Sequence, residues 1–192
     1  MRLKPQLTTA ITAVTMRKTA FAPVVSASTR VLILGSLPGE LSLAAARYYA
    51  NPRNRFWQLV GEVLARPDLP KLDYDDRLAL LLANGIGLWD AVASADRPGS
   101  LDSAIRNAEP AALAELVASL PQLRAVAFNG RTSAKIARAQ IADASLELID
   151  LPSSSPAHTA MPFAQKCQVW LILRQFLASP LPCANNGGIG NS

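Results

Sequence analysis

Four short runs of apolar residues form the most regular pattern in the chain. They lie at residues 30–34, 86–90, 123–128 and 146–151. A short apolar run such as residues 30–34, without alternating polar positions, is typical of a strand buried on both faces of a sheet. Gly35 follows the first run, Asn129 and Gly130 the third, and Pro152 the fourth, and such residues end strands. We therefore predict four strands, of which the first is expected to be fully buried.

Between these runs, apolar residues recur at helical spacing. The clearest predicted helix spans residues 55–65, and its apolar stripe consists of Phe56, Leu59, Val60, Val63 and Leu64. Asn54 precedes this stripe, where a helix cap is expected. Pro110 is expected to open another helix. The further predicted helices are 41–48, 75–83, 110–120, 132–141 and 163–177.

Strands that alternate with helices favour a parallel sheet with right-handed crossovers. The predicted fold class is therefore α/β, with three layers (α/β/α) and a central four-stranded parallel sheet. Ligands of such sheets bind beyond the carboxyl ends of the strands. Here those ends carry residues 35–39, Trp89-Asp90, Asn129-Gly130 and residues 152–158, so we expect the functional site there.

The length of 192 residues suits one domain, which we predict at residues 30–178. Residues 1–29 are expected to form a partly flexible N-terminal extension, and residues 179–192 a flexible tail rich in glycine and asparagine. Half of the residues are hydrophobic and only 17% are charged, which is typical of a globular protein.

Charge and cysteine content narrow the classes of partner. The net charge of +5 suits a polyanion such as nucleic acid, and no apolar run is long enough to span a membrane. Cys167, Cys183 and His158 lack the spacing of a metal site or an iron–sulfur cluster, so we expect no metal and no cofactor. Two isolated thiols suit a reducing compartment, so we expect a cytoplasmic protein. We also expect it to be a monomer.

The first segment that can carry chemistry is GSLPGE, residues 35–40. A rigid turn after a buried strand can direct its backbone N–H groups towards a ligand. The segment lacks the lysine of a phosphate loop and the glycine spacing of a Rossmann motif. Taken alone, it is more simply explained as a tight turn without a ligand.

The second segment is RYYANPRNRFW, residues 47–57. Aromatic side chains can stack on bases, and arginines can neutralise phosphates. Phe56 belongs to the apolar stripe, so we assign it to the core. Tyr48, Tyr49 and Asn51 precede the helix on a loop broken by proline, and a purely structural role explains them less well.

The third segment is LPSSSPAHT, residues 151–159. Its hydroxyls and backbone amides can grip phosphates, although an ordinary linker has the same composition. His158 is the only histidine, and a single histidine is more often a surface or capping residue than a catalyst. A Ser–His–acid hydrolase is disfavoured because the chain has no G-x-S-x-G elbow.

Together and in this order, these segments resemble the motifs of the uracil-DNA glycosylase superfamily. GSLPGE resembles its first motif, LPSSSPAH its second, and ANPRNRFW the H-P-x-N-x-F-W stretch of the mismatch-specific uracil and thymine glycosylases. With GLWD and FNG added, the set is most similar to the hypoxanthine-DNA glycosylase branch, also called DNA-deoxyinosine glycosylases. The resemblance covers about residues 30–177.

The resemblance implies an enzyme of base excision repair that acts on double-stranded DNA containing deaminated bases. Such an enzyme flips the damaged nucleotide into a pocket, and water attacks the sugar C1′ as the N-glycosidic bond breaks. Donors aimed at the departing base would stabilise its negative charge. The implied substrate is hypoxanthine.

The chain departs from the mismatch-specific branch at Leu37. That branch carries at this position the asparagine that positions the water, and leucine cannot do so. The resemblance therefore implies a catalytic role for Asn54 first and for Asn51 second. Asn54 can combine this role with helix capping only if its side chain turns to the pocket.

Further roles follow from matching positions. Tyr49 is expected to stack on the flipped base, and Asn129 to bind a base edge. The residues expected to line the base pocket are Gly35, Ser36, Leu37, Pro38, Gly39, Tyr49 and Asn129. The loop at residues 153–158 would enter the minor groove. The residues expected to contact DNA are Arg47, Arg53, Ser153, Ser154, Ser155, Pro156 and His158.

Three alternatives stay open at this point. The substrate can be mainly uracil, because both bases are deamination products that leave as stabilised anions. The protein can be a DNA-binding module that is catalytically weak, as Leu37 suggests. A nucleotide- or phosphate-binding protein rests on the glycine turn alone.

Overall fold

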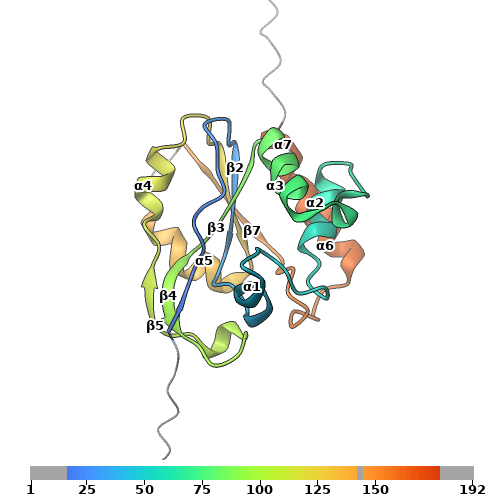
Figure 1. Ribbon diagram of the computed structural model, residues 1–192. Coiled ribbons are helices and arrows are strands. Elements are labelled where there is room, and N and C mark those ends of the chain that lie inside the picture. Colours follow the sequence, from blue (N-terminus) through green and yellow to red (C-terminus); the bar gives the residue numbers. More distant parts are fainter. Residues whose placement is uncertain (1–16, 142–144, 178–192) are drawn as a thin grey trace, which may run out of the picture.

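The centre of the protein is a four-stranded parallel sheet with strand order β3-β2-β6-β7 (Figure 1). The computed structural model describes residues 17–141 and 145–177. The strands of this sheet are β2 (Val31–Gly35), β3 (Ile86–Asp90), β6 (Ala125–Asn129) and β7 (Glu147–Leu151). Every neighbouring pair in it is parallel, so the predicted α/β fold and its four strands are confirmed.

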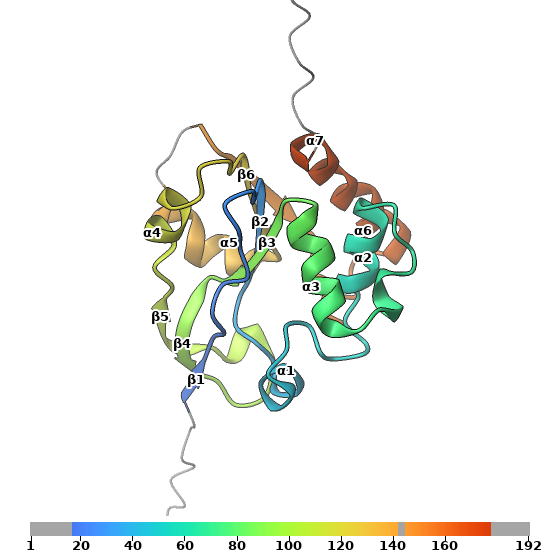
Figure 2. The same cartoon turned by 45° about the horizontal axis from the view of Figure 1, so that its top comes forward.

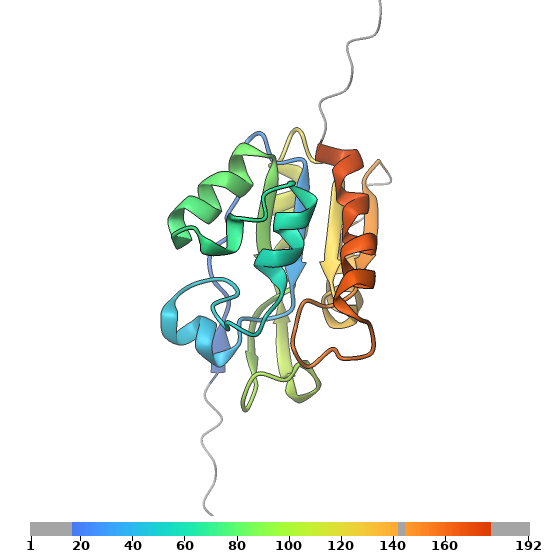
Figure 3. The same ribbon diagram turned by 90° about the vertical axis from the view of Figure 1, so that its right-hand side faces the viewer.

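Helices cover both faces of this sheet (Figures 1 and 3). On one face lie α2 (Phe56–Val63), α3 (Tyr74–Ala83), α6 (Phe163–Trp170) and α7 (Arg174–Leu177). On the other face lie α4 (Leu113–Ala118) and α5 (Arg131–Ala137). The remaining helical segments are α1 (Glu40–Ala45), η1 (Leu69–Lys71), η2 (Asp102–Ala104), η3 (Arg138–Gln140) and η4 (Leu171–Leu173).

Strand β2 shows why the apolar runs lack alternation. Val31 and Ile33 belong to one core cluster, whereas Leu32 and Leu34 belong to the cluster on the opposite face, and all four are fully buried. Successive side chains of a strand point to opposite faces, so a strand covered on both sides needs apolar residues at every position.

A second, antiparallel sheet was not predicted from the sequence. It has strand order β1-β4-β5 and comprises β1 (Arg17–Thr19), β4 (Val92–Asp96) and β5 (Arg106–Pro110). Strand β5 is exposed along its length, and its register with β4 shifts twice. A short, polar, irregular strand has neither a continuous apolar run nor a period of two, so the sequence pattern does not reveal it.

The helix predicted to open at Pro110 begins later in the structure. Pro110 ends β5, where it pairs with Val92, and α4 begins only at Leu113. Residues 17–29, predicted to lie in the extension, pack on the domain. There Val24 forms a bridge to Leu88, and the Trp89 indole donates to the carbonyl of Phe21. The predicted tail and residues 1–16 lie outside the described residues.

The carboxyl ends of the parallel strands point to one end of the molecule. Figures 1 and 2 place α1, which follows β2, beyond these ends, whereas α7 lies at the opposite end. Within the described part of the chain, no helix is long and apolar enough to cross a membrane.

Helix α2 depends on a glycine that helix propensity alone would not favour. A Cβ at Gly61 would lie 2.8 Å from the carbonyl oxygen of Arg66, which is closer than real contacts allow. We expect Gly61→Ala to lower the free energy of unfolding by about 1–2 kcal/mol, despite alanine's better propensity. Urea denaturation measures this change. Glu62→Ala, at an exposed neighbour, should change the value by less than about 0.5 kcal/mol, and equal effects of both variants would contradict the expectation.

Candidate active site

A cavity of about 890 Å³ lies at the carboxyl ends of the parallel strands. Its wall includes Gly35 at the end of β2, Asp90 at the end of β3, Asn129 at the end of β6 and the loop after β7. This is the position at which a parallel sheet between helices binds its ligands.

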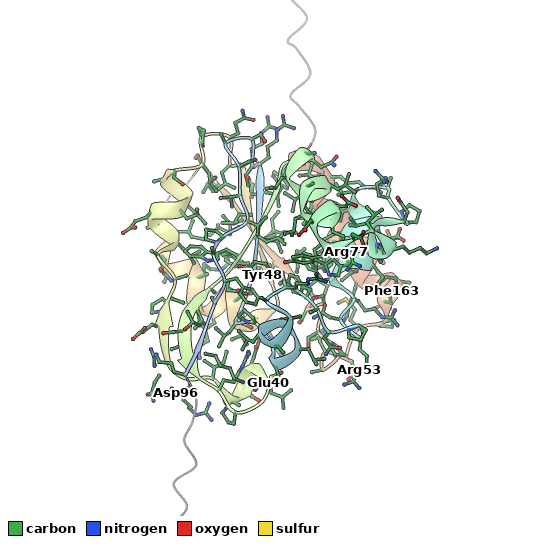
Figure 4. All side chains as sticks on the ribbon, viewed as in Figure 1. Glu40, Tyr48, Arg53, Arg77, Asp96 and Phe163 are labelled. Carbon is green, nitrogen blue, oxygen red and sulfur yellow. The ribbon has the colours of Figure 1, made fainter. Side chains whose placement is uncertain are left out.

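All but one of the site residues predicted from the sequence line this cavity. They are Gly35, Ser36, Leu37, Pro38, Gly39, Tyr49, Asn51, Arg53, Asn54, Asn129, Ser153, Ser154, Ser155, Pro156 and His158. The exception is Arg47, which lines a neighbouring cavity of about 470 Å³ and places its guanidinium 5.2 Å from the centre of the Tyr74 ring. Figure 4 shows Arg53 near the edge of the molecule and Tyr48 near its centre.

The glycine turn after β2 is held by a buried arginine. Arg97 is 1% exposed, and its guanidinium donates hydrogen bonds to the carbonyl oxygens of Leu37 and Pro38. The side chain of Leu37 packs with Val92 and Ala95 in a small core cluster. The Leu37 side chain therefore belongs to the packing of the turn and adds no polar group to the cavity.

Tyr49 is held on three sides. Its ring stacks on Phe56 with the ring centres 3.7 Å apart and the planes 7° from parallel. The Trp57 indole donates to its backbone carbonyl, and Asn129 Nδ2 donates to its hydroxyl at 3.2 Å. Its φ of 52° is a left-handed conformation that is uncommon for a side chain of this size. Phe56, assigned to the core from the sequence, is fully buried.

Asn129 connects β6 to the loop after β7. Its Nδ2 donates to the hydroxyl of Ser154 at 2.9 Å, and its Oδ1 accepts from the Ser154 backbone N–H at 2.9 Å. Ser154 is 1% exposed, and its carbonyl accepts from the backbone N–H of Arg55. Ser154 was expected to contact DNA. In the structure its side chain attaches the loop after β7 to the end of β6, and its carbonyl attaches the loop to the start of α2.

A buried lysine holds the two ends of the same loop. Lys166 on α6 donates to the carbonyl oxygens of Ser153 at 2.7 Å and His158 at 2.9 Å. Its side chain is buried, and burial lowers the pKa of its ammonium below the usual value. Both bonds go to the backbone, so they set where the loop lies whatever side chains it carries.

The two asparagines proposed for catalysis lie on the loop before α2. Asn54 Oδ1 accepts from the Phe56 N–H at 2.9 Å, so Asn54 bonds to the first N–H of α2, although the cap position itself is Arg55, one residue later than predicted. Asn51 Oδ1 accepts from the Arg53 N–H at 3.0 Å, and its carbonyl accepts from the Asn54 N–H. Both side chains also line the cavity. An amide oxygen has two lone pairs, so Asn54 can cap the helix and still bind a water.

Asp90 is the most unusual titratable group of the cavity. It is 4% exposed, and its Oδ2 is buried without a hydrogen-bond partner among the described residues. Burial raises the pKa of its carboxyl to about 7, the charge of Arg97 opposes this increase, and Asp102 adds to it. Near neutral pH the group therefore exchanges between the acid and the carboxylate.

Several cavity residues were not assigned a role from the sequence. They include Asp90, Leu41, Leu101, Asp102, Arg131 and Thr132. The signal for Asp90 was its place at the end of a predicted strand. The segment at residues 100–103 carries no comparable signal, because it reaches the cavity only through the second sheet. No group of three or more acidic, histidine or cysteine side chains in the described ranges is placed to hold a metal ion.

Comparisons with known proteins agree with this geometry. Residues 22–175 match the family described as the uracil DNA glycosylase superfamily. A protein of Methanosarcina barkeri (strain Fusaro / DSM 804) named hypoxanthine DNA glycosylase is 41% identical over 118 residues, which cover 62% of this chain and 74% of that relative. A Methanosarcina acetivorans protein of the same name is 38% identical over 143 residues, covering 74% and 89%.

Among solved structures that share the fold, one has a sequence similar enough to compare in detail. It is a solution NMR structure from Methanosarcina acetivorans, described as a provisional uracil DNA glycosylase. It matches with a TM-score of 0.74 and 34% sequence identity, over 84% of this chain and 99% of that one.

The raised pKa of Asp90 makes stability depend on pH. The folded protein holds this proton up to about pH 7, whereas an unfolded aspartate releases it near pH 3.9. Stability therefore falls as the pH rises between these values. Asp90→Asn removes this dependence. From pH 5 to pH 8 the free energy of unfolding of the variant, relative to that of wild type, should therefore increase by about 2–4 kcal/mol. Urea denaturation at both pH values measures the difference, and an unchanged difference would contradict the raised pKa.

The bonds of Lys166 predict a loss of stability on substitution. Lys166→Met keeps the apolar stem but leaves the carbonyls of Ser153 and His158 without their donor. We expect a loss of about 1–3 kcal/mol in the free energy of unfolding. The exposed Lys135, replaced by methionine in the same way, is the matched control and should change little. Equal stability of the Lys166 variant and wild type would mean that water replaces the ammonium.

Proposed function

This chain belongs to the uracil-DNA glycosylase superfamily, and from that premise we propose that it removes hypoxanthine from double-stranded DNA by hydrolysis of the N-glycosidic bond. It is a DNA glycosylase, and DNA is its substrate. Hypoxanthine, formed when adenine is deaminated, is the base named for the two relatives that are 41% and 38% identical to it.

The observation that carries this proposal is the convergence of separate segments on one cavity. The turn after β2, the loop before α2, the end of β6 and the loop after β7 all contribute polar groups to it. These are four of the five segments whose motifs resemble the hypoxanthine branch, and the fifth, GLWD, ends at Asp90, which also lines the cavity. A cavity of about 890 Å³ is within the usual range for small-molecule sites and has room for a flipped nucleotide.

The proposed mechanism assigns the water to Asn54. Its amide lies at the cavity wall and is fixed by the bond from Phe56 N–H, so it can orient a water towards C1′ of the flipped nucleotide. Asn51 is the second candidate for this role, because it belongs to the same loop. Backbone N–H groups of the turn at residues 36–39 would face the base or the sugar, where donors offset the charge of the leaving base.

Recognition of the base is assigned to Tyr49 and Asn129. Phe56 covers one face of the Tyr49 ring, which leaves the other face for stacking on a base. Asn129 already bonds to Tyr49 and Ser154, and the second lone pair of its Oδ1 can accept from a base edge. The two residues therefore act as one hydrogen-bonded unit.

DNA contacts are assigned to the loop at residues 153–158 and to the arginines beside it. Ser153, Ser155, Pro156 and His158 line the cavity, as does Arg53. The Lys166 bonds hold this loop in place, and the net charge of +5 favours a polyanion. We also propose that the protein acts as a monomer. The DNA contact expected of Arg47 and the cytoplasmic location stay predictions.

Uracil is the second candidate substrate. The solved structure that is 34% identical to this chain is described as a provisional uracil DNA glycosylase. Uracil and hypoxanthine share the lactam edge that deamination creates, so one pocket can accept both bases.

The assay for this proposal uses duplexes with a single deoxyinosine or deoxyuridine, and alkali to reveal abasic sites. We expect cleavage mainly at deoxyinosine, and Asn54→Ala to lower the single-turnover rate about 10²–10³-fold, as loss of one preorganised polar group does. Asn51→Ala should lower it less.

Asn84→Ala is the matched control, because this exposed asparagine at the end of α3 lies away from the cavity. Cleavage mainly at deoxyuridine would change the substrate and keep the family. DNA binding without release of either base would favour the binding module instead.

A further inference from the structure

One carboxyl group at the cavity has no role in the mechanism proposed above. Asp90 lies where β3 ends, opposite Gly35 in the parallel register of β2 and β3. A Cβ at position 35 would lie 2.5 Å from Asp90 Oδ1, so only glycine leaves room for this carboxyl beside the end of β2. The wall of the cavity is thus built around the Asp90 side chain.

Among the described residues, no lysine or arginine forms a hydrogen bond with the Asp90 carboxyl. From the segment after α1, Tyr48 and Tyr49 lie beside it. The Tyr48 hydroxyl, which donates to the carbonyl of Ala22, also interacts with the Asp90 carboxyl and slightly opposes the rise in its pKa. Arg97, which follows β4, directs its Nη atoms to the turn carbonyls.

The remaining charged neighbour is a second carboxylate. Asp102 of η2 accepts from the Ser36 hydroxyl at 2.6 Å and lies 3.8 Å from Arg97. It therefore takes up part of the positive charge of Arg97 that would otherwise favour an ionised Asp90.

A buried carboxyl oxygen without a partner is costly to stability and is rarely kept without a function. Oδ2 of Asp90 is such an atom, in a side chain that is 4% exposed and that lines the cavity. Desolvation and the Asp102 charge both favour the protonated acid, and burial raises the pKa of Asp90 to about 7. A protonated carboxyl at neutral pH is a hydrogen-bond and proton donor.

We propose that Asp90 is a catalytic acid that protonates a purine base as the base leaves the sugar. This role rests on the proposed excision of hypoxanthine and specifies the substrate class as deaminated purines. A carboxylate at this place would repel the departing base, which gains negative charge, whereas the acid neutralises that charge.

The proton balance of the step is complete. The C1′–N9 bond breaks with its electron pair passing to the base, and N7 of the base takes the proton of Asp90. Water adds its hydroxyl to C1′, and the proton released from that water returns the Asp90 carboxylate to the acid. The net reaction converts the deoxyinosine nucleotide and water to an abasic site and neutral hypoxanthine.

The same chemistry separates purines from uracil. Hypoxanthine carries N7, a ring nitrogen with a lone pair in the plane of the base. Uracil offers only carbonyl oxygens there, and these are weaker bases. An acid at Asp90 therefore accelerates loss of hypoxanthine more than loss of uracil.

The experiment measures single-turnover excision from duplexes containing deoxyinosine, 7-deaza-deoxyinosine or deoxyuridine, between about pH 5.5 and 9. The wild-type rate on deoxyinosine should fall as the pH rises through about 7, because the acid form is lost. Asp90→Asn should lower this rate about 10²-fold or more and remove that pH dependence. Its effect on deoxyuridine should be smaller.

Two comparisons separate an acid from a merely structural carboxyl. On 7-deaza-deoxyinosine, which lacks N7, Asp90→Asn should cause no further loss beyond that of the substrate change. Asp150→Asn is the control, because this carboxylate is 70% exposed and forms an ion pair with Arg138. This variant should match wild type on all three substrates and at every pH. Carboxyl ¹³C NMR of the wild-type protein should show Asp90 titrating well above the usual range for aspartate, a readout that needs no variant and no activity.

The outcomes are distinguishable. An Asp90→Asn enzyme with the wild-type rate and pH profile on deoxyinosine would overturn the acid, as would equal losses on all three substrates or an ordinary titration of Asp90. None of these would touch the proposed excision of hypoxanthine. A wild-type protein that releases no base from any duplex would overturn the proposed function and the acid together.

Discussion

The parallel alignment of β2 with its two neighbours determines where every group of the site lies. Gly35 pairs with Asp90 on one side, and β6, on the other side, ends at Asn129. Because parallel strands end at a common edge, segments that are far apart in sequence deliver their last strand residues to one place. The buried Arg97, which bonds to the turn after β2, extends this arrangement into the second sheet. The cavity is thus a property of the sheet, and the loops only complete it.

The sequence predicted this sheet well because short apolar runs bounded by strand-ending residues have a strong signature, which is clearest at the fully buried β2. The four strands and helix α2 were all found from apolar runs and stripes, and the sequence also located the site at the strand ends. The second sheet was missed since β5 is exposed and irregular. Lys166 shows the same limit for side chains: on a helix it resembles a solvated charge, and only the fold reveals that it is buried under a loop.

The individual site residues show what tertiary contacts add. Asp90 was visible as a polar residue ending a strand, but its lack of a partner depends on where Arg97 and Tyr48 point. Ser154 was expected at the DNA surface and instead bonds to Asn129. Asn54 was assigned both a capping bond and a place at the cavity, and the structure contains both. Such double use of one side chain can be suspected from sequence, but it is established only by geometry.

The attachment of the loop after β7 has a consequence for how related enzymes can diverge. Lys166 binds the carbonyls of Ser153 and His158, and backbone carbonyls are present whatever amino acids stand there. The side chains between these anchor points can therefore be exchanged while the path of the backbone is inherited. Placement and chemistry of the loop are encoded by different residues, so a library that randomises positions 155–157 and keeps Lys166 samples new DNA contacts on a fixed support.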